Sequence, residues 1–144
     1  MRVVRADTDD RHEDALSVRY DVFVDEQGVP EDLEVDEHED DALHFVAYDD
    51  GEPVGAARLR EYEAGVGKVE RVAVLEFRRG EGWGSALMDA VEDAARGRFE
   101  ELYLHAQLPV EGFYARRGYE REGDEFEEAG ITHVAMRKHL ESAD

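Results

Sequence analysis

The sequence predicts an α+β fold of three layers (α/β/α), in which helices cover both faces of a mixed, mostly antiparallel central sheet. Short apolar segments separated by tight, glycine-containing turns are typical of antiparallel strands. A helical segment that links two further strands through a glycine-rich loop is typical of a right-handed crossover between parallel strands. The predicted order is βαβββαβαββ, within a single domain of residues 1–144.

The composition narrows the class of protein. Hydrophobic residues make up 42% of the 144 residues, which is enough for one ordinary core and argues against disorder. The absence of cysteine excludes disulfides, thiolate metal sites and a cysteine nucleophile. No apolar run approaches the ~20 residues that cross a bilayer, and the first residues lack the pattern of a signal peptide. We therefore expect a cytoplasmic protein with no membrane partner.

The net charge of −21 is large for this length and would repel nucleic acid and anionic lipid. Only Lys68 and Lys138 are lysines, and the acidic residues are spread along the whole chain. This pattern resembles that of halophilic proteins, in which high ionic strength screens the self-repulsion of an acidic protein. The alternative is attraction of a cationic substrate, such as a polyamine or a basic protein.

The first third of the chain predicts a strand, a helix and an acidic loop. Residues 2–6 are apolar enough for a strand, and residues 7–10 supply N-cap side chains for the helix that follows. Apolar residues at helical spacing continue this helix to about Gly28, where glycine and Pro30 are stop signals. Residues 32–41 predict a solvated surface loop, although His38 and its neighbouring carboxylates could hold a cation.

The remaining elements follow from turn signals and periodicity. Strands are predicted at 42–48 and 54–62 around an Asp-Gly hairpin turn, and at 68–75 after a second glycine turn. A helix is expected from about 83 to 94 and a strand at 101–106. A short helix at 109–117 then precedes two strands, 119–122 and 131–138, with an acidic connection between them.

A glycine-rich loop between the 68–75 strand and the next helix is the strongest functional signal. Glycine permits positive φ and close approach of a ligand, and a helix start leaves backbone N–H groups without partners. Such a loop can seat a phosphate or diphosphate. The alternative is a strand-to-helix turn that needs glycine for packing. The loop residues are Arg79, Gly80, Glu81, Gly82, Trp83, Gly84 and Ser85.

Two motifs resemble the signatures of the GNAT acetyltransferase superfamily. Arg79, Gly82 and Gly84 match its Arg/Gln-x-x-Gly-x-Gly/Ala signature, and residues 113–119 (FYARRGY) resemble its second signature. Residues 19–30, 104–107 and 128–133 resemble the narrower ElaA-like branch. The resemblance implies a GNAT-like acyl-CoA N-acyltransferase fold. It also implies direct transfer of an acetyl group from acetyl-CoA, as co-substrate and without a metal, to a primary amine.

The resemblance also carries expectations for individual residues. The coenzyme would be held by the backbone of Val72, Ala73 and Val74 and by the glycine loop, where Arg79 either contacts the diphosphate or points to solvent. Tyr114 matches the tyrosine that hydrogen-bonds the coenzyme sulfur and can act as a general acid. Many relatives have asparagine where this chain has Pro109, so that contact is lost or moved, for example to Gln107.

The general base and the acceptor are less well defined by the sequence. Glu70 is the first candidate base, and His105 the second because histidine is the side chain that ordinarily titrates near neutral pH; His133 and Glu128 lie further out. Arg19, Glu26, Gln27 and His133 are expected to contact the acceptor, although the first three could instead fix the loop after the first helix. Either histidine could also be a packing residue.

The acceptor itself is an unidentified small-molecule or peptide amine, and a homodimer is the common assembly of the superfamily. Two other functions stay open at this point. Residues 19–23 also resemble acyl-homoserine-lactone synthases, which suggests a longer acyl-CoA as donor. A non-catalytic acyl-CoA-binding sensor would keep the glycine loop without turnover.

Overall fold

The computed structural model describes residues 2–31 and 36–140 and contains a seven-stranded sheet with strand order β1-β2-β3-β4-β5-β7-β6. Only β4 and β5 pair in parallel among the described strands; the other neighbours are antiparallel. The strands are β1 (Arg2–Arg5), β2 (Leu43–Asp49), β3 (Glu52–Glu63), β4 (Val66–Val74), β5 (Glu101–Gln107), β6 (Glu120–Glu128) and β7 (Ile131–His139). The predicted order of elements and the mixed sheet are confirmed.

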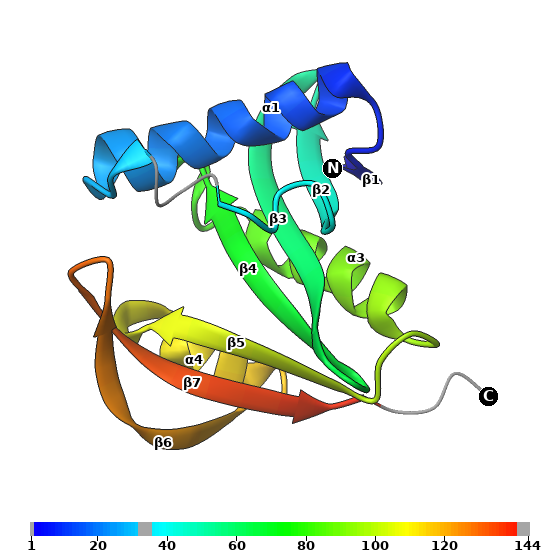
Figure 1. Ribbon diagram of the computed structural model, residues 1–144. Coiled ribbons are helices and arrows are strands. Elements are labelled where there is room, and N and C mark those ends of the chain that lie inside the picture. Colours follow the sequence, from blue (N-terminus) through cyan, green and yellow to red (C-terminus); the bar gives the residue numbers. More distant parts are fainter. Residues whose placement is uncertain (1, 32–35, 141–144) are drawn as a thin grey trace.

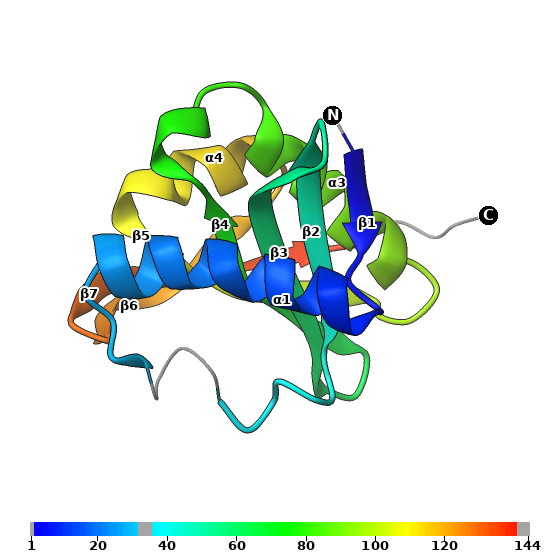
Figure 2. The same cartoon turned by 90° about the horizontal axis from the view of Figure 1, so that it is seen from above.

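Helices lie on both faces of this sheet, as predicted (Figures 1 and 2). They are α1 (Asp9–Arg19), α3 (Trp83–Ala95) and α4 (Glu111–Arg116), with short turns η2 (Glu76–Arg78) and η3 (Leu108–Val110) before the last two. Thr8 is the N-cap of the first helix, and its hydroxyl accepts a hydrogen bond from the Arg11 N–H at 3.3 Å. It continues directly into a wider π-helical segment, η1 (Tyr20–Glu26), which the sequence did not predict.

Each face of the sheet carries its own core. On one face, Ala15, Val18 and Val22 of the first helical segment pack on Val46 and Ala56 of the sheet. On the other face, α3 contributes the larger core through a stripe of buried side chains at helical spacing: Trp83, Leu87, Met88, Val91 and Ala95. The helices on one face, the sheet, and the helices on the other face are the three layers of the fold, with one core between each pair of layers.

Two predictions about the acidic segments are wrong. The connection after residue 122 is not a loop, because β6 runs on to Glu128 and pairs with β7 around an irregularity that contains Gly123 at φ 79°. Backbone pairing at a sheet edge tolerates its exposed carboxylates. The loop predicted at 32–41 is not solvated throughout, because Glu39 is buried; residues 32–35 lie outside the described residues.

Among the described residues, no helix is long and apolar enough to span a membrane.

Candidate active site

The two parallel strands at the centre of the sheet separate partway along their length. Their pairing runs from Val66 with Glu101 to Val69 with Leu104. Beyond this point β4 and β5 diverge, and Figure 1 shows them opening away from their shared start. The second halves of both strands therefore border an open wedge, and β4 has one edge without a strand partner there among the described residues.

A bulge in β4 accompanies this separation. Arg71 has φ 56°, which is a left-handed conformation that non-glycine residues rarely adopt. The register with β3 shifts at this place, because Ala56 pairs with Ala73 whereas Arg58 pairs with Glu70. Two residues of β4 thus face one residue of β3, which bends the strand and increases its twist.

The backbone beyond the bulge presents polar groups to the wedge. The Leu75 N–H donates to the Val54 carbonyl at 3.0 Å, so by alternation Ala73 also bonds β3. The backbone C=O of Val72 and the backbone N–H and C=O of Val74 therefore point away from β3, toward the open edge of β4. An extended ligand can pair with these groups as an added strand would.

The glycine loop follows at the end of this edge and leads into α3. Gly80 and Gly82 have φ of 82° and 95°, and Gly82 is the N-cap of the helix. No described residue accepts a hydrogen bond from the backbone N–H groups of residues 80–85, and the first intrahelical bond runs from Ala86 to the Gly82 carbonyl. These donors, at the positive end of a helix of 13 residues, make a suitable seat for a diphosphate.

Arg79 of the glycine loop and Arg78 just before it both have carboxylate partners. Arg79 forms two hydrogen bonds of 2.8 Å with Glu26, and its Nε donates to the Val74 carbonyl at 3.0 Å. Arg78 pairs with Asp49 and with Glu81, whose Oε1 also accepts a hydrogen bond from the Trp83 indole at 3.0 Å. The anion-binding capacity of the loop therefore resides in its backbone rather than in unpaired guanidinium groups.

A groove of about 460 Å³ lies beside the Glu26–Arg79 pair, between η1 and η2. Its lining combines carboxylates with apolar side chains: Asp21, Val22, Asp25, Glu26, Leu75, Glu76 and Phe77. Phe77 is the most exposed large apolar side chain among the described residues, at 77%. Acidic walls suit a cation better than a phosphate.

The four residues expected at the acceptor site occupy different environments. Arg19 is fully buried and forms two hydrogen bonds of 2.8 Å with Glu39, so its side chain supports the interior of the fold. Gln27 and Gln107 exchange amide hydrogen bonds of 2.9 and 3.4 Å between the end of η1 and the end of β5. The structure thus brings Glu26 and Gln27 to opposite sides of the wedge, where Glu26 pairs with Arg79 of the glycine loop and Gln27 with Gln107 of β5.

The first candidate base, Glu70, is surrounded by cations. Its side chain is 10% exposed and lies 2.7 Å from Arg58, 2.9 Å from Arg60 and 3.5 Å from Lys68. Burial alone would raise its pKa, but these neighbouring positive charges outweigh burial and the pKa of Glu70 lies below its ordinary value. A carboxylate held in this way is a weak proton acceptor at neutral pH.

His105 lies in a different arrangement on β5, just beyond the last residue that pairs with β4. Its Nδ1 is 3.1 Å from Glu128 Oε1 and its Nε2 is 3.1 Å from the Tyr103 hydroxyl. The hydrogen bond with His105 is the main cause that lowers the pKa of Glu128, which therefore stays ionised. A histidine oriented by a carboxylate is a common arrangement for a general base. The Nδ1 of nearby His133 instead donates to the Ile131 carbonyl at 2.7 Å.

Tyr114 lies on α4 within the larger core. It is 7% exposed, and its ring meets those of Phe113 and Tyr119 edge-on at centroid distances of 5.0 and 5.7 Å. Burial raises the pKa of Tyr114, so its hydroxyl is protonated at physiological pH. No described residue bonds this hydroxyl, which leaves it available to a ligand.

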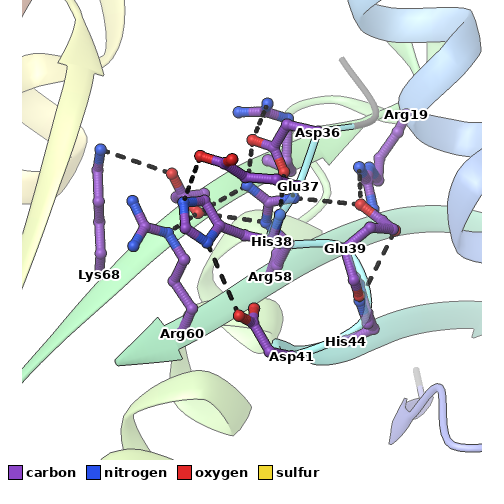
Figure 3. A network of polar contacts seen from close by, with 12 residues as sticks. Arg19, Asp36, Glu37, His38, Glu39, Asp41, His44, Arg58, Arg60 and Lys68 are labelled. Carbon is purple, nitrogen blue, oxygen red and sulfur yellow. Dashed lines mark hydrogen bonds and ion pairs between the residues drawn. The ribbon is translucent and has the colours of Figure 1, made fainter. Parts of the chain in front are cut away.

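Sequence reasoning missed a network of ion pairs beneath the site (Figure 3). Arg58, fully buried on β3, bonds both Asp36 oxygens at 2.8 and 3.0 Å, Glu39 at 3.1 Å and Glu70 at 2.7 Å. His12 and His44 join it through Glu39, at 2.8 Å from its Oε2 and 2.7 Å from its carbonyl respectively. The signal in the sequence is a single arginine within the apolar run 54–59, since a buried charge needs partners.

Comparison with known proteins agrees with this geometry. Residues 7–140 match the family described as Acetyltransferase (GNAT) domain. YjcF of Bacillus subtilis, named an uncharacterized N-acetyltransferase, is 42% identical over 140 residues, covering 96% of this chain and 99% of YjcF.

Two solved structures have the same fold. ElaA of Escherichia coli superimposes with a TM-score of 0.83 at 25% identity, covering 96% of this chain and 97% of ElaA. An acyl-CoA N-acyltransferase of Pseudomonas aeruginosa gives a TM-score of 0.82 at 29% identity, covering 96% of this chain and 99% of that one. Together with the family match, these likenesses show that this chain is an acyltransferase and belongs to the GNAT acetyltransferase family.

Proposed function

We propose that this protein transfers an acetyl group from acetyl-CoA to a primary amine by direct attack of the amine on the thioester. The observation that carries the proposal is the wedge between β4 and β5. It has outward-facing peptide groups at Val72 and Val74 on one side, and it ends at a helix start whose N–H groups lack acceptors among the described residues.

The coenzyme fits this site in an extended form. Its pantetheine arm would pair with the free edge of β4, and its diphosphate would accept hydrogen bonds from the backbone of residues 80–85. A backbone N–H near Val72 would then polarise the thioester carbonyl. In other enzymes, removal of one such hydrogen-bond donor raises the activation free energy by about 3 kcal/mol. Arg79 can reach the diphosphate only if it leaves or shares Glu26.

The chemistry requires a base for the amine and an acid for the departing thiolate. We assign the base to His105, ahead of Glu70, because His105 borders the open part of the wedge and is oriented by Glu128. The bound ammonium group first gives a proton to His105, which frees the nitrogen lone pair to bond the carbonyl carbon. The carbon–sulfur bond then breaks, the departing thiolate takes a proton from the Tyr114 hydroxyl, and the proton that the new amide nitrogen loses restores Tyr114, while His105 returns its proton to solvent.

The acceptor class also follows from charge. The groove beside Glu26 and the overall charge of −21 favour a cationic amine, either a small molecule or a basic peptide. The same acidity supports activity at high ionic strength, so the assay should cover low and high salt.

Release of free thiol from acetyl-CoA, measured with a panel of primary amines, tests this proposal. We expect amine-dependent thiol release that is strongly reduced in Tyr114→Phe. A longer acyl-CoA used in preference to acetyl-CoA would favour the acyltransferase alternative. Coenzyme binding without thiol release for every amine, with Tyr114→Phe binding unchanged, would favour a sensor and contradict the proposal.

A further inference from the structure

The bulge at Arg71 is held by a contact that comes from outside the sheet. Arg71 lies on β4 immediately before Val72, in the left-handed conformation described above. Its Nη2 donates to Asp36 Oδ2 at 3.2 Å. Asp36 belongs to the acidic segment between the first helix and β2, 35 residues earlier in the chain.

Asp36 is itself held firmly in place. Both of its oxygens accept hydrogen bonds from the buried guanidinium of Arg58, and its Oδ1 also accepts the His38 N–H at 3.0 Å. Arg58 projects from β3, the strand that faces the bulge, and Figure 3 shows Asp36 beside it. The Asp36 carboxylate therefore links Arg71, in the bulge of β4, to Arg58 on the neighbouring strand β3.

The backbone conformation of Arg71 determines which backbone groups of β4 point into the wedge. A non-glycine residue in the left-handed region is strained and persists only where the surroundings hold it. Loss of the bulge would shift the β3–β4 register by one residue, and a one-residue shift exchanges the two sides of a strand. The groups of Val72 and Val74 that now point into the wedge would then point elsewhere.

We propose that Asp36 is a positioning residue for acetyl transfer, which acts through Arg71 by holding the bulge that aims the β4 edge at the coenzyme. The inference rests on the proposed function for its kinetic readout. It assigns a specific task to the acidic segment, which contacts neither the glycine loop nor Tyr114 in the described structure.

Replacement of Arg71 by two different residues separates backbone geometry from side-chain charge. Both Arg71→Ala and Arg71→Gly lose the contact with Asp36, but glycine adopts positive φ without a penalty. We expect kcat/KM for acetyl-CoA to fall about tenfold in Arg71→Ala and to stay within about twofold of wild type in Arg71→Gly. The KM for the amine should change little in either variant.

A double-mutant cycle then assigns the effect to Asp36. Asp36→Asn keeps the shape of the side chain and should lower kcat/KM for acetyl-CoA about fivefold in the wild-type background. In the Arg71→Gly background the same substitution should cost less than about twofold, because glycine holds the bulge unaided. Asp40→Asn, at an exposed position of the same segment, is the matched control and should have no effect.

Three results would overturn the proposal. The first is an equal loss in Arg71→Ala and Arg71→Gly, the second is no loss in either, and the third is the same cost of Asp36→Asn in both backgrounds. If Asp36→Asn does not fold, Asp36→Ser takes its place in the cycle. Amide hydrogen exchange of residues 72–74 by NMR gives a readout without activity, and Arg71→Gly should match wild type whereas Arg71→Ala should not. An inactive wild type that obeys this exchange pattern, with Asp36→Asn changing the exchange of residues 72–74 as Arg71→Ala does, would refute the proposed function but retain the role of Asp36 in holding the bulge.

Discussion

Arg79 of the glycine loop and Glu26 at the end of the first helical segment are 53 positions apart and form a bidentate ion pair, with both N–O distances at 2.8 Å. The pair holds the pKa of Glu26 below its ordinary value. Arg79 also bonds the Val74 carbonyl on the edge expected to meet the pantetheine arm. One side chain therefore links both expected coenzyme contacts to the helical segment that borders the acceptor side.

Glu26→Gln should strengthen coenzyme binding. The substitution removes the charge that competes with the diphosphate for Arg79, and an exposed ion pair is worth up to ~1 kcal/mol, so the Kd for acetyl-CoA should fall by about two- to fivefold. Isothermal titration calorimetry measures this change. Asp25→Asn, an exposed neighbour with the same change of charge, is the control for general electrostatics. Equal effects of the two substitutions would mean that Arg79 does not reach the coenzyme.

Tyr114→Phe should reduce turnover with little effect on folding. General acid catalysis contributes typically 10²- to 10⁴-fold, so we expect kcat to fall by at least ~100-fold. The hydroxyl bonds no described residue, and the melting temperature should therefore change little. Because burial raises the pKa of Tyr114, wild-type activity should show no loss from tyrosine ionisation up to about pH 10. An unchanged kcat in the variant would remove Tyr114 from the mechanism.

Glu39 should make the stability of the fold sensitive to acid. Burial opposes ionisation of this carboxyl, but hydrogen bonds from Arg19 and His12 outweigh it and lower its pKa from 4.5 to about 2. A lowered folded-state pKa contributes stability that is complete above pH ~4.5 and is lost as the pH falls toward about 2. The difference in unfolding free energy between wild type and Glu39→Gln should therefore be about 3–5 kcal/mol at pH 6 and should shrink below pH 4.

The comparison with the variant is needed because acid also acts on the whole protein. Protonation of other carboxylates reduces the self-repulsion of a chain with net charge −21, which opposes the loss at Glu39. Urea titrations from pH 6 to pH 2 supply the unfolding free energies. Asp40→Asn should differ from wild type by no more than about 0.5 kcal/mol throughout. A difference for Glu39→Gln that does not depend on pH would contradict the assigned ion pairs.

Gly82→Asp should abolish coenzyme binding while the protein stays folded. The aspartate would place a negative charge beside the N–H groups that are expected to hold the diphosphate, at the positive end of α3. Gly97→Asp is a matched control, because Gly97 also has positive φ (87°), follows the other end of the same helix and has open space around its Cα. Binding of acetyl-CoA by calorimetry should be lost only in Gly82→Asp. Wild-type affinity in that variant would refute the assignment of the loop.

The order of elements could be predicted because it is encoded by neighbours in the chain. The Asp50–Gly51 turn defines the hairpin of β2 and β3, and the stripe from Trp83 to Ala95 defines α3. The strand β6 escaped prediction because its stability comes from pairing with β7, and its nine residues are exposed apart from the partly buried Phe126. An exposed edge strand has no apolar alternation to reveal it.

The wedge and its supports could not be predicted, because they depend on contacts between distant segments. Neither Arg71 nor Asp36 carries a local signal for positive φ or for burial. The separation of β4 from β5 begins beside that backbone conformation, which residue type alone does not encode. The glycine loop and Tyr114 were recognisable from motif spacing, whereas the choice between Glu70 and His105 required knowledge of the cations around Glu70.

Incubation of the protein with isotopically labelled acetyl-CoA and a panel of primary amines, followed by mass spectrometry of the amines, tests acetyl transfer most directly. The account predicts a labelled acetamide and an equal amount of free thiol with the wild-type protein, and neither with Gly82→Asp. Thiol release without any labelled amine, or labelled product formed equally by Gly82→Asp, would contradict it.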